Sequence, residues 1–398
     1  MTVLPTGAAP AHRESTALPR VAPRQPRVRL DAFPRKASNR WLLRLALAAP
    51  FVVIALIEHF SSGLTSGTTV NQDLLARVEQ IDWTRADVSW VGSLYPPIGT
   101  VLASLIPGGT LGLGIAGAVV AGPFLQQMIE VMHQRRFPRI KATAFFIALA
   151  VNPLFAYTVT TNFEAFLGIA FFGVGAINMF RFIVNRNTQA GFRAGLLFMV
   201  SALSSTSGLV FIAVAGVTAP LLTLARRGQR GARASNILVI LFPTLSTFVT
   251  VFFLQLVFLH RPFAVLTTQF TYDPTRWALF PQLVTTLNGF LILAPMLSGW
   301  ALALLVRRPG AILISTFLFV ALIFGYVFDL IPLNAAGNTF LIMTMMGIAI
   351  LPAATTRRAT TLITIVAGAQ IIIAWAAAYN RPVVLDWMGS LTHTLGWN

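Results

Sequence analysis

The sequence predicts an all-α integral membrane protein, a polytopic bundle of about eleven transmembrane helices. Hydrophobic residues make up 56% of its 398 residues and charged residues only 10%, whereas a soluble domain carries roughly 25% charged residues. Apolar runs long enough to cross a bilayer recur along the chain. The arginine and lysine residues gather in short segments between these runs, which is the pattern that orients membrane helices.

The chain divides into three predicted regions. Residues 1–40 are rich in Pro, Ala and Arg and lack apolar periodicity, so they predict a disordered basic tail in the cytoplasm. Residues 41–379 form the predicted transmembrane domain, whose first span, residues 41–60, lies too far from the start of the chain for a cleaved secretory signal. Residues 380–398 are expected to form a short extracytoplasmic tail.

The predicted spans place the positive charge on one side of the membrane. After the first span, spans are expected at about 111–132, 142–159, 164–184, 193–204, 207–225, 235–258, 283–306, 310–329, 337–353 and 360–379. The basic clusters between them then share the face of the N-terminal tail. Because short cytoplasmic loops carry the excess of Lys and Arg, we expect a multi-pass protein of the cell (plasma) membrane with a cytoplasmic N-terminus and an extracytoplasmic C-terminus.

Two segments are assigned from the number of membrane crossings that keeps every basic cluster on the cytoplasmic side. Residues 192–225 begin and end beside cytoplasmic arginines and are too long for one crossing, so they predict a hairpin that turns near Ser204 to Ser207, where hydroxyls cap the helix ends. Residues 95–109 cannot cross without inverting every later span, so they predict a partly embedded helix on the outer side. The long first extracytoplasmic loop therefore covers 61–110 and carries amphipathic helices.

Composition and missing motifs exclude several classes of function. The formal net charge is +17, but it lies between apolar runs, so we expect no nucleic-acid partner. The chain has no cysteine, which excludes disulfides, thiolate metal sites and cysteine nucleophiles. A Walker loop, a dinucleotide fingerprint and a His/Glu metalloprotease motif are also absent from the sequence, which leaves ATP-driven transport, redox and zinc chemistry without support.

The first outer loop holds the candidate catalytic residues. It contains Asp73, Asp82 and Asp87 together with Arg77 and Arg85, and a connection this long in an economical bundle usually has a task. A carboxylate there can deprotonate an acceptor hydroxyl, or hold a divalent cation such as Mg or Mn beside a phosphate leaving group. The alternative is a solvated acidic helix on the membrane surface, anchored by the two tryptophans of the loop.

The second long outer loop, residues 259–282, holds Arg261 and Arg276. Two arginines contradict the scarcity of positive charge on the outer side. A lipid-linked phosphate at the outer headgroup level accounts for them, since guanidinium binds phosphate with paired donors. Contact with ordinary headgroups or with Asp273 is the alternative.

Three short motifs occur in order within residues 41–260. An early carboxylate follows the first span in Val70-Asn71-Gln72-Asp73-Leu74-Leu75-Ala76, and Tyr95-Pro96-Pro97 leads into the embedded helix. The hairpin, residues 194–209, begins with Ala-Gly-Leu-Leu and turns at Ser-Ser-Thr-Ser. In these features the chain resembles the glycosyltransferase C superfamily, polytopic enzymes that use polyprenyl-phosphate sugars and include aminoarabinose, mannosyl- and arabinosyltransferases.

The resemblance implies a membrane glycosyltransferase on the outer membrane face. It would transfer a sugar from a polyprenyl-phosphate donor to a glycan, lipid or protein acceptor of the cell envelope. A first-loop carboxylate, Asp73 first and Asp82 or Asp87 next, would be the general base. The residues expected to bind the lipid phosphate are Arg77, Arg85, Tyr95, Arg261 and Arg276.

The chain also departs from the pattern of that family. The hairpin turn carries Ser and Thr where a basic residue is usual, and Asp73 lacks an adjacent acidic partner. Two other functions therefore stay open. One is a non-enzymatic transporter or flippase of a lipid or amphipathic solute, in which the same outer charges gate entry. The other is an inactive scaffold of an envelope-synthesis complex.

Overall fold

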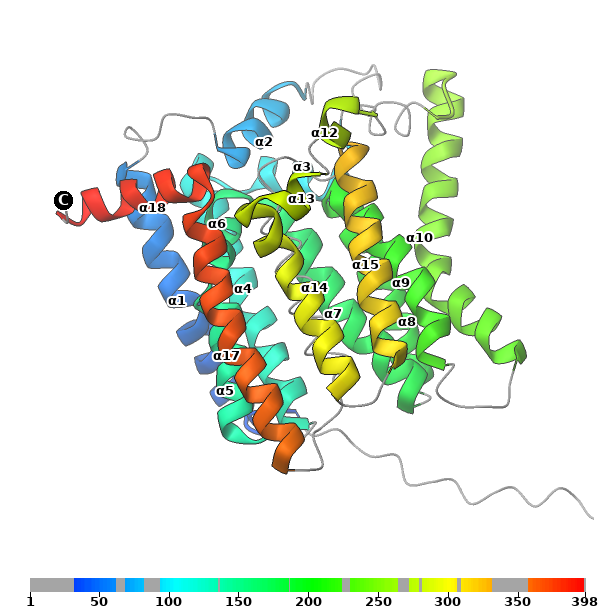
Figure 1. Ribbon diagram of the computed structural model, residues 1–398. Helices are drawn as coiled ribbons and strands as arrows, with labels where there is room; N and C mark the ends of the chain where they lie inside the picture. Colours follow the sequence, from blue (N-terminus) through cyan, green and yellow to red (C-terminus); the bar gives the residue numbers. More distant parts are fainter. Residues whose placement is uncertain are drawn as a thin grey trace, which may run out of the picture.

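The computed structural model describes residues 32–61, 69–81, 94–134, 137–185, 187–223, 230–263, 272–278, 281–305, 309–330 and 357–396. Every extended regular element in these ranges is an α-helix (Figure 1). The helices are α1 (Ala37–Ser61), α2 (Val70–Glu79), α3 (Pro97–Leu105), α4 (Gly109–Gln134), α5 (Arg139–Ala150), α6 (Pro153–Thr161), α7 (Phe163–Asn185), α8 (Thr188–Ser204), α9 (Thr206–Thr223), α10 (Arg230–Leu259), α12 (Pro274–Ala278), α13 (Gln282–Thr285), α14 (Leu287–Leu305), α15 (Pro309–Val327), α17 (Arg357–Tyr379) and α18 (Pro382–Thr394).

Several of these helices have the length and composition of membrane spans. Within the described ranges, five helices, α1, α4, α7, α10 and α17, are long and apolar enough to cross a membrane, and the bent pair α5 and α6 makes a sixth if it counts as one span. The class of all-α membrane protein is thereby confirmed. The predicted span at 337–353 lies outside the described residues.

The bundle has two chemically different ends. Figure 1 shows α2, α3, α12 and α18 gathered at one end, the upper end in that view. We call it the acidic end, because most described carboxylates belong to its helix ends and short helices. These carboxylates are Glu58, Asp73, Glu79, Glu164, Asp273, Asp329 and Asp386. The opposite, basic end holds the helix termini that carry Arg139, Lys141, Arg181, Arg193 and Arg357.

The predicted single span at 142–159 is broken in the structure. Helix α5 ends at Ala150, α6 begins at Pro153, and their axes differ by 47°. Proline lacks the N–H that would continue the helix and suits the first turn of a new one. The Asn152 side chain accepts a hydrogen bond from the backbone N–H of Leu154 and caps α6. The Asn-Pro pair is therefore the local cause of the bend.

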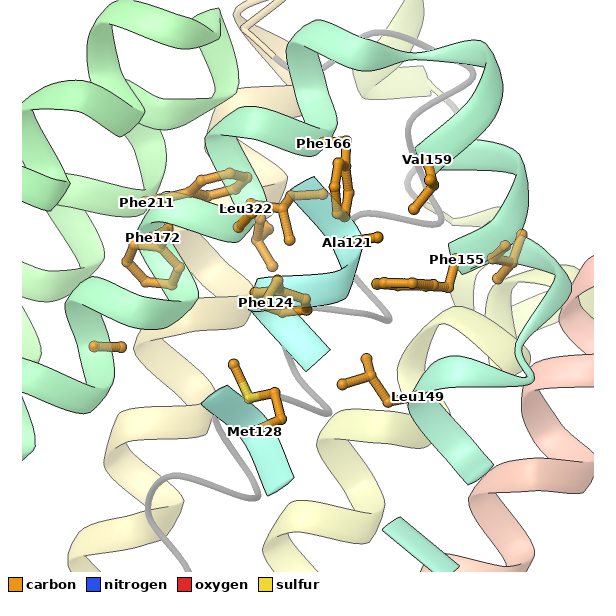
Figure 2. Close-up of a cluster of buried hydrophobic side chains, with 14 of the residues drawn as sticks. Ala121, Phe124, Met128, Leu149, Phe155, Val159, Phe166, Phe172, Phe211 and Leu322 are labelled. Carbon is orange, nitrogen blue, oxygen red and sulfur yellow. The ribbon is translucent and has the colours of Figure 1, made fainter. Parts of the chain in front are cut away.

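The core contains phenylalanines from several helices, packed with alanine, valine, leucine and methionine side chains (Figure 2). Phe155 of α6 meets Phe166 of α7 edge to face, with ring centroids 5.6 Å apart, and Phe166 meets Phe124 of α4 in the same way at 6.1 Å. Such aromatic pairs add to the stabilisation that burial alone supplies. These contacts hold α4, α6 and α7 together below the acidic end.

Glycines let the backbones of neighbouring helices approach closely. A Cβ at Gly117 of α4 would overlap the carbonyl of Val159, and one at Gly122 would overlap the carbonyl of Arg44 in α1. Small residues at helix crossings are the usual means of packing inside a membrane, where lipid removes the hydrophobic drive for association. Helix α4 is thus fitted against α1 on one side and α6 on the other.

A polar network joins α1, α4 and α7 toward the basic end. Gln126, Glu130 and Gln134 follow one another by four residues on α4 and are hydrogen-bonded in sequence. Arg44 of α1 donates to Gln126, and Arg181 of α7 donates to Gln134 at 2.7 Å. Glu130, only 8% exposed, therefore neutralises part of the positive charge of this end from within the bundle.

The region expected as a short outer tail contains a packed helix. Helix α18 lies across the ends of the longer helices at the acidic end (Figure 1) and contacts α1, α6 and α17. Its buried residues Val384, Trp387 and Ser390 recur at helical spacing and form the face toward the bundle. Val383 and Leu385 on the remaining surface are exposed.

Candidate functional site

The predicted hairpin turn lies at the acidic end. Helix α8 ends at Ser204 and α9 begins at Thr206, so the chain reverses within one intervening residue. The hydroxyls of this turn act differently from the predicted caps. Ser204 donates to the carbonyl of Val200, whereas Thr206 and Ser207 both donate to the carbonyl of Leu330, at 3.2 and 3.1 Å. The turn is therefore hydrogen-bonded to Leu330, which lies just after the end of α15.

Tyr95 joins the first outer loop to the same hairpin. Its side chain is 5% exposed, and its hydroxyl donates to the carbonyl of Ala202 in α8 at 3.0 Å. Burial raises the pKa of the Tyr95 phenol, and the nearby negative charge of Glu164 raises this pKa further. Tyr95, predicted to bind a lipid phosphate, thus has its hydroxyl engaged by protein backbone.

An ion pair holds α2 against the first turn of α7. Arg77 Nη2 lies 2.6 Å from Glu164 Oε2, and Arg77 Nη1 donates to the carbonyl of Tyr95 at 3.2 Å. Glu164 is 9% exposed and also benefits from its place at a helix N-terminus. This partner of Arg77 was not predicted from the sequence. An acidic residue in the first turn of an apolar span was its signal, but nothing in the pattern indicated which arginine would meet it.

Asn71 is a second attachment of α2 that sequence reasoning missed. Its side chain is 2% exposed, donates to the carbonyl of Thr160 at 2.8 Å and accepts from the N–H of Phe163 at 2.9 Å. The polar side chain thereby satisfies backbone groups where α6 ends and α7 begins. Asn71 and Leu74 form the buried face of α2.

Of the three predicted catalytic carboxylates, only Asp73 lies within the described residues. Asp73 lies in the first turn of α2, on the exposed face opposite Asn71, behind a capping box formed by Thr69 and Gln72. Asp82, Asp87 and Arg85 lie outside the described residues. Within the described ranges, no group of three or more His, Asp or Glu side chains is arranged to hold a metal ion. The divalent cation stays a prediction.

Arg276 lies in a second polar cluster formed by α12 and the end of α15. Its guanidinium is 2.5 Å from Asp329 Oδ1 and 3.2 Å from Asp273 Oδ2, and it donates to the carbonyl of Tyr326 at 2.9 Å. The residue is 8% exposed. Arg276 was predicted to contact either a lipid-linked phosphate or Asp273, and the structure shows the contact with Asp273. A phosphate could bind Arg276 only by displacing one of these carboxylates.

Asp273 is held in its ionised form by its surroundings. The Thr275 hydroxyl donates to Asp273 Oδ1 at 2.5 Å, the Thr275 N–H donates to the same oxygen, and the Arg276 charge lies beside it. These interactions, the hydroxyl hydrogen bond first, lower the pKa of the Asp273 carboxyl.

Two arginines of the acidic end have no carboxylate partner among the described residues. Arg261 follows α10 and is exposed. Arg381 precedes α18 and lies close enough to Tyr326 for the two groups to interact, while burial lowers the pKa of its guanidinium. Arg381 was not among the predicted site residues. The signal that singled out Arg261 and Arg276, an arginine on the predicted outer side, applies to Arg381 as well.

The fold and these clusters define an all-α membrane protein whose first outer loop, hairpin turn and α12–α15 region meet at one end. No protein-family model, no curated protein and no solved structure matches the chain. A proposal about function therefore starts from the chemistry of the acidic end.

Proposed function

We propose that this chain is a membrane glycosyltransferase that works at its acidic end. In this proposal about eleven spans cross the plasma membrane, with the N-terminus in the cytoplasm and the acidic end outside. The donor is a sugar on a polyprenyl phosphate, and the acceptor is a hydroxyl of a cell-envelope glycan, lipid or protein. The fold relationship proposed is with the glycosyltransferase C superfamily.

One observation carries the proposal: the first outer loop, the hairpin turn and the Arg276 segment of the second outer loop are joined at one end, the last of these through the end of α15. The first outer loop meets α8 through the bond from Tyr95 to the carbonyl of Ala202. The hairpin turn meets the end of α15 through the bonds from Thr206 and Ser207 to the carbonyl of Leu330. These contacts support a single outer site to which all three segments contribute.

The charges of this end suit the chemistry of sugar transfer. An ionised first-loop aspartate takes the proton of the acceptor hydroxyl, the hydroxyl oxygen bonds to the anomeric carbon, and the bond from that carbon to the phosphate oxygen breaks. The polyprenyl phosphate leaves with an added negative charge. Arg77 and Arg276 are already paired with carboxylates, whereas Arg261 and Arg381 lack described carboxylate partners, so in this proposal Arg261 or Arg381 receives this charge.

Replacing each candidate base in turn tests the proposal. Asp73→Asn, Asp82→Asn and Asp87→Asn are each expressed and assayed for transfer of radiolabelled mannose or arabinose from its decaprenyl phosphate. For at least one variant we expect transfer to fall by about 100-fold or more, the usual contribution of a general base. Glu79→Gln is the matched control, because Glu79 is an exposed carboxylate on the same helix as Asp73, and it should retain wild-type transfer.

Two results would contradict this assignment. If all three asparagine variants transfer sugar at the wild-type rate, none of these carboxylates is the base. If purified protein in liposomes moves the sugar lipid across the bilayer without consuming it, the activity is that of a flippase.

A further inference from the structure

Glu58 is a partly buried residue whose carboxyl group the proposed reaction does not use. It lies in the last turn of α1, where α1, α6 and α18 meet at the acidic end. Its Oε2 atom is buried and has no hydrogen-bond partner. Within the described parts of the chain, Glu58 forms no ion pair with a lysine, arginine or histidine. In an ionised carboxylate, the Oε2 atom would lack both a hydrogen-bond donor and contact with water, and no described counter-charge would compensate it.

The neighbours of Glu58 are uncharged polar and aromatic side chains. Thr160 of α6 and Trp387 of α18 lie beside the carboxyl, and the Tyr157 phenol of α6 is the titratable group that interacts with it. The rings of Tyr157 and Trp387 meet edge to face, with centroids 5.5 Å apart. The indole N–H of Trp387 is also buried without a hydrogen-bond partner. Helix α18 thus packs over a cluster of groups that suit a neutral acid.

Glu164 provides an internal comparison at the same end of the bundle. It is 9% exposed, and Arg77 lies 2.6 Å away and compensates its charge. A buried carboxylate is tolerated when it is paired and is strongly disfavoured when it is alone. Glu164 therefore has a described arginine beside it, and Glu58 has none.

We infer that Glu58 is a proton-binding site formed by α1, α6 and α18, and that its carboxyl group carries the proton when α18 is packed over it. The ligand is a proton because it removes the unpaired charge and needs no cavity. The neutral acid has one O–H to donate and a carbonyl oxygen to accept, so it can satisfy polar groups of both α6 and α18. Deprotonation would favour separation of α18 from α1, since water would then reach the charge.

Infrared difference spectroscopy tests the inference directly. Spectra of the wild-type protein and of Glu58→Gln are recorded at pH 7 in lipid bilayers, in water and in deuterated water. The difference should contain the C=O stretch of one protonated carboxylic acid, which shifts on deuteration and is absent from the variant. A difference that contains the two bands of a carboxylate instead would overturn the proposal.

Thermal unfolding of the same variant gives a second, independent result. Glutamine has the shape and hydrogen-bonding groups of the protonated acid, so Glu58→Gln should melt within a few degrees of wild type. Glu164→Gln is the matched control, because it removes the charge from a paired glutamate, and it should lower the melting temperature. If Glu58→Gln fails to fold or melts well below Glu164→Gln, the site requires the charged form and the inference is wrong.

Trp387→Phe separates the role of α18 from that of the carboxyl. This change removes the indole N–H while keeping an aromatic ring against Tyr157. The carboxylic-acid band should remain and shift in frequency, because the carbonyl loses a nearby donor. An unchanged band would show that α18 does not contribute to the site.

Discussion

Arg77 and Arg276 hold the acidic end together through opposite charges brought from elsewhere in the chain. Each guanidinium meets at least one carboxylate and one backbone carbonyl. Glu164 is the more enclosed member of its pair, since its side chain is 11% exposed and that of Arg77 is 28% exposed. Removing Arg77 and removing Glu164 should therefore lower the stability of the protein by different amounts.

The first prediction concerns this asymmetry. Arg77→Ala leaves a carboxylate buried and unpaired, and should lower the free energy of unfolding by about 3 kcal/mol. Glu164→Ala should cost less, because the remaining guanidinium is partly exposed and can be hydrated. Equilibrium unfolding in mixed micelles of sodium dodecyl sulfate measures both values.

The double variant provides the control for this pair. Arg77→Ala combined with Glu164→Ala removes both charges and should be less destabilised than the sum of the two single variants. Strict additivity of the two losses would mean that the ion pair contributes nothing to stability.

At the level of helices, the hairpin of α8 and α9 depends on how closely its two arms approach. A Cβ at Gly208 in α9 would overlap the carbonyl of Ser201 in α8. Ser201 itself donates to the carbonyl of Gly168 in α7 at 2.7 Å, so it is not free to move aside. The contact between the arms therefore requires a residue without a side chain at position 208.

Gly208→Ala tests this requirement. We expect a loss of about 1–3 kcal/mol in the free energy of unfolding, the range for overpacking a close contact. Gly389→Ala in α18 is the matched control, because its Cβ would have no atom within 4 Å, and alanine favours a helix over glycine by up to about 1 kcal/mol. Thermal unfolding followed by circular dichroism should show a lower melting temperature for the first variant only. Equal melting temperatures would contradict the tight crossing.

At the scale of the whole molecule, the separation of charge predicts how the bundle is oriented. Among the described residues, Arg139, Arg181, Arg193 and Arg357 lie at the basic end, and positive loops usually remain in the cytoplasm. We therefore expect the acidic end to face outward. The natural sequence has no cysteine, so any introduced cysteine is the sole thiol of the protein.

Single cysteines at the two ends test the orientation. Glu79→Cys lies on the exposed face of α2, and Arg139→Cys lies at the exposed start of α5. A membrane-impermeant maleimide added to intact cells should label the first variant and leave the second unlabelled until the membrane is permeabilised. The reverse pattern would place the acidic end in the cytoplasm and exclude a donor on the outer face.

The sequence alone was sufficient for the class of the protein and for several of its segments. Hydropathy and charge are patterns of neighbouring residues, so they indicated apolar helices and the turn near Ser204. They were less reliable at Asn152-Pro153, where a local cap and a proline break one predicted span into two helices. The reason is that apolar length does not report where a helix bends.

Only the tertiary structure decided which polar groups meet. Arg77 and Glu164 are 87 residues apart, and Tyr95 and Ala202 are 107 residues apart. Partners at such distances leave no periodic signal in one sequence, because each contact depends on how several helices pack. The same packing pairs Glu164 and leaves Glu58 without a counter-charge among the described residues, although both are glutamates near the ends of apolar helices.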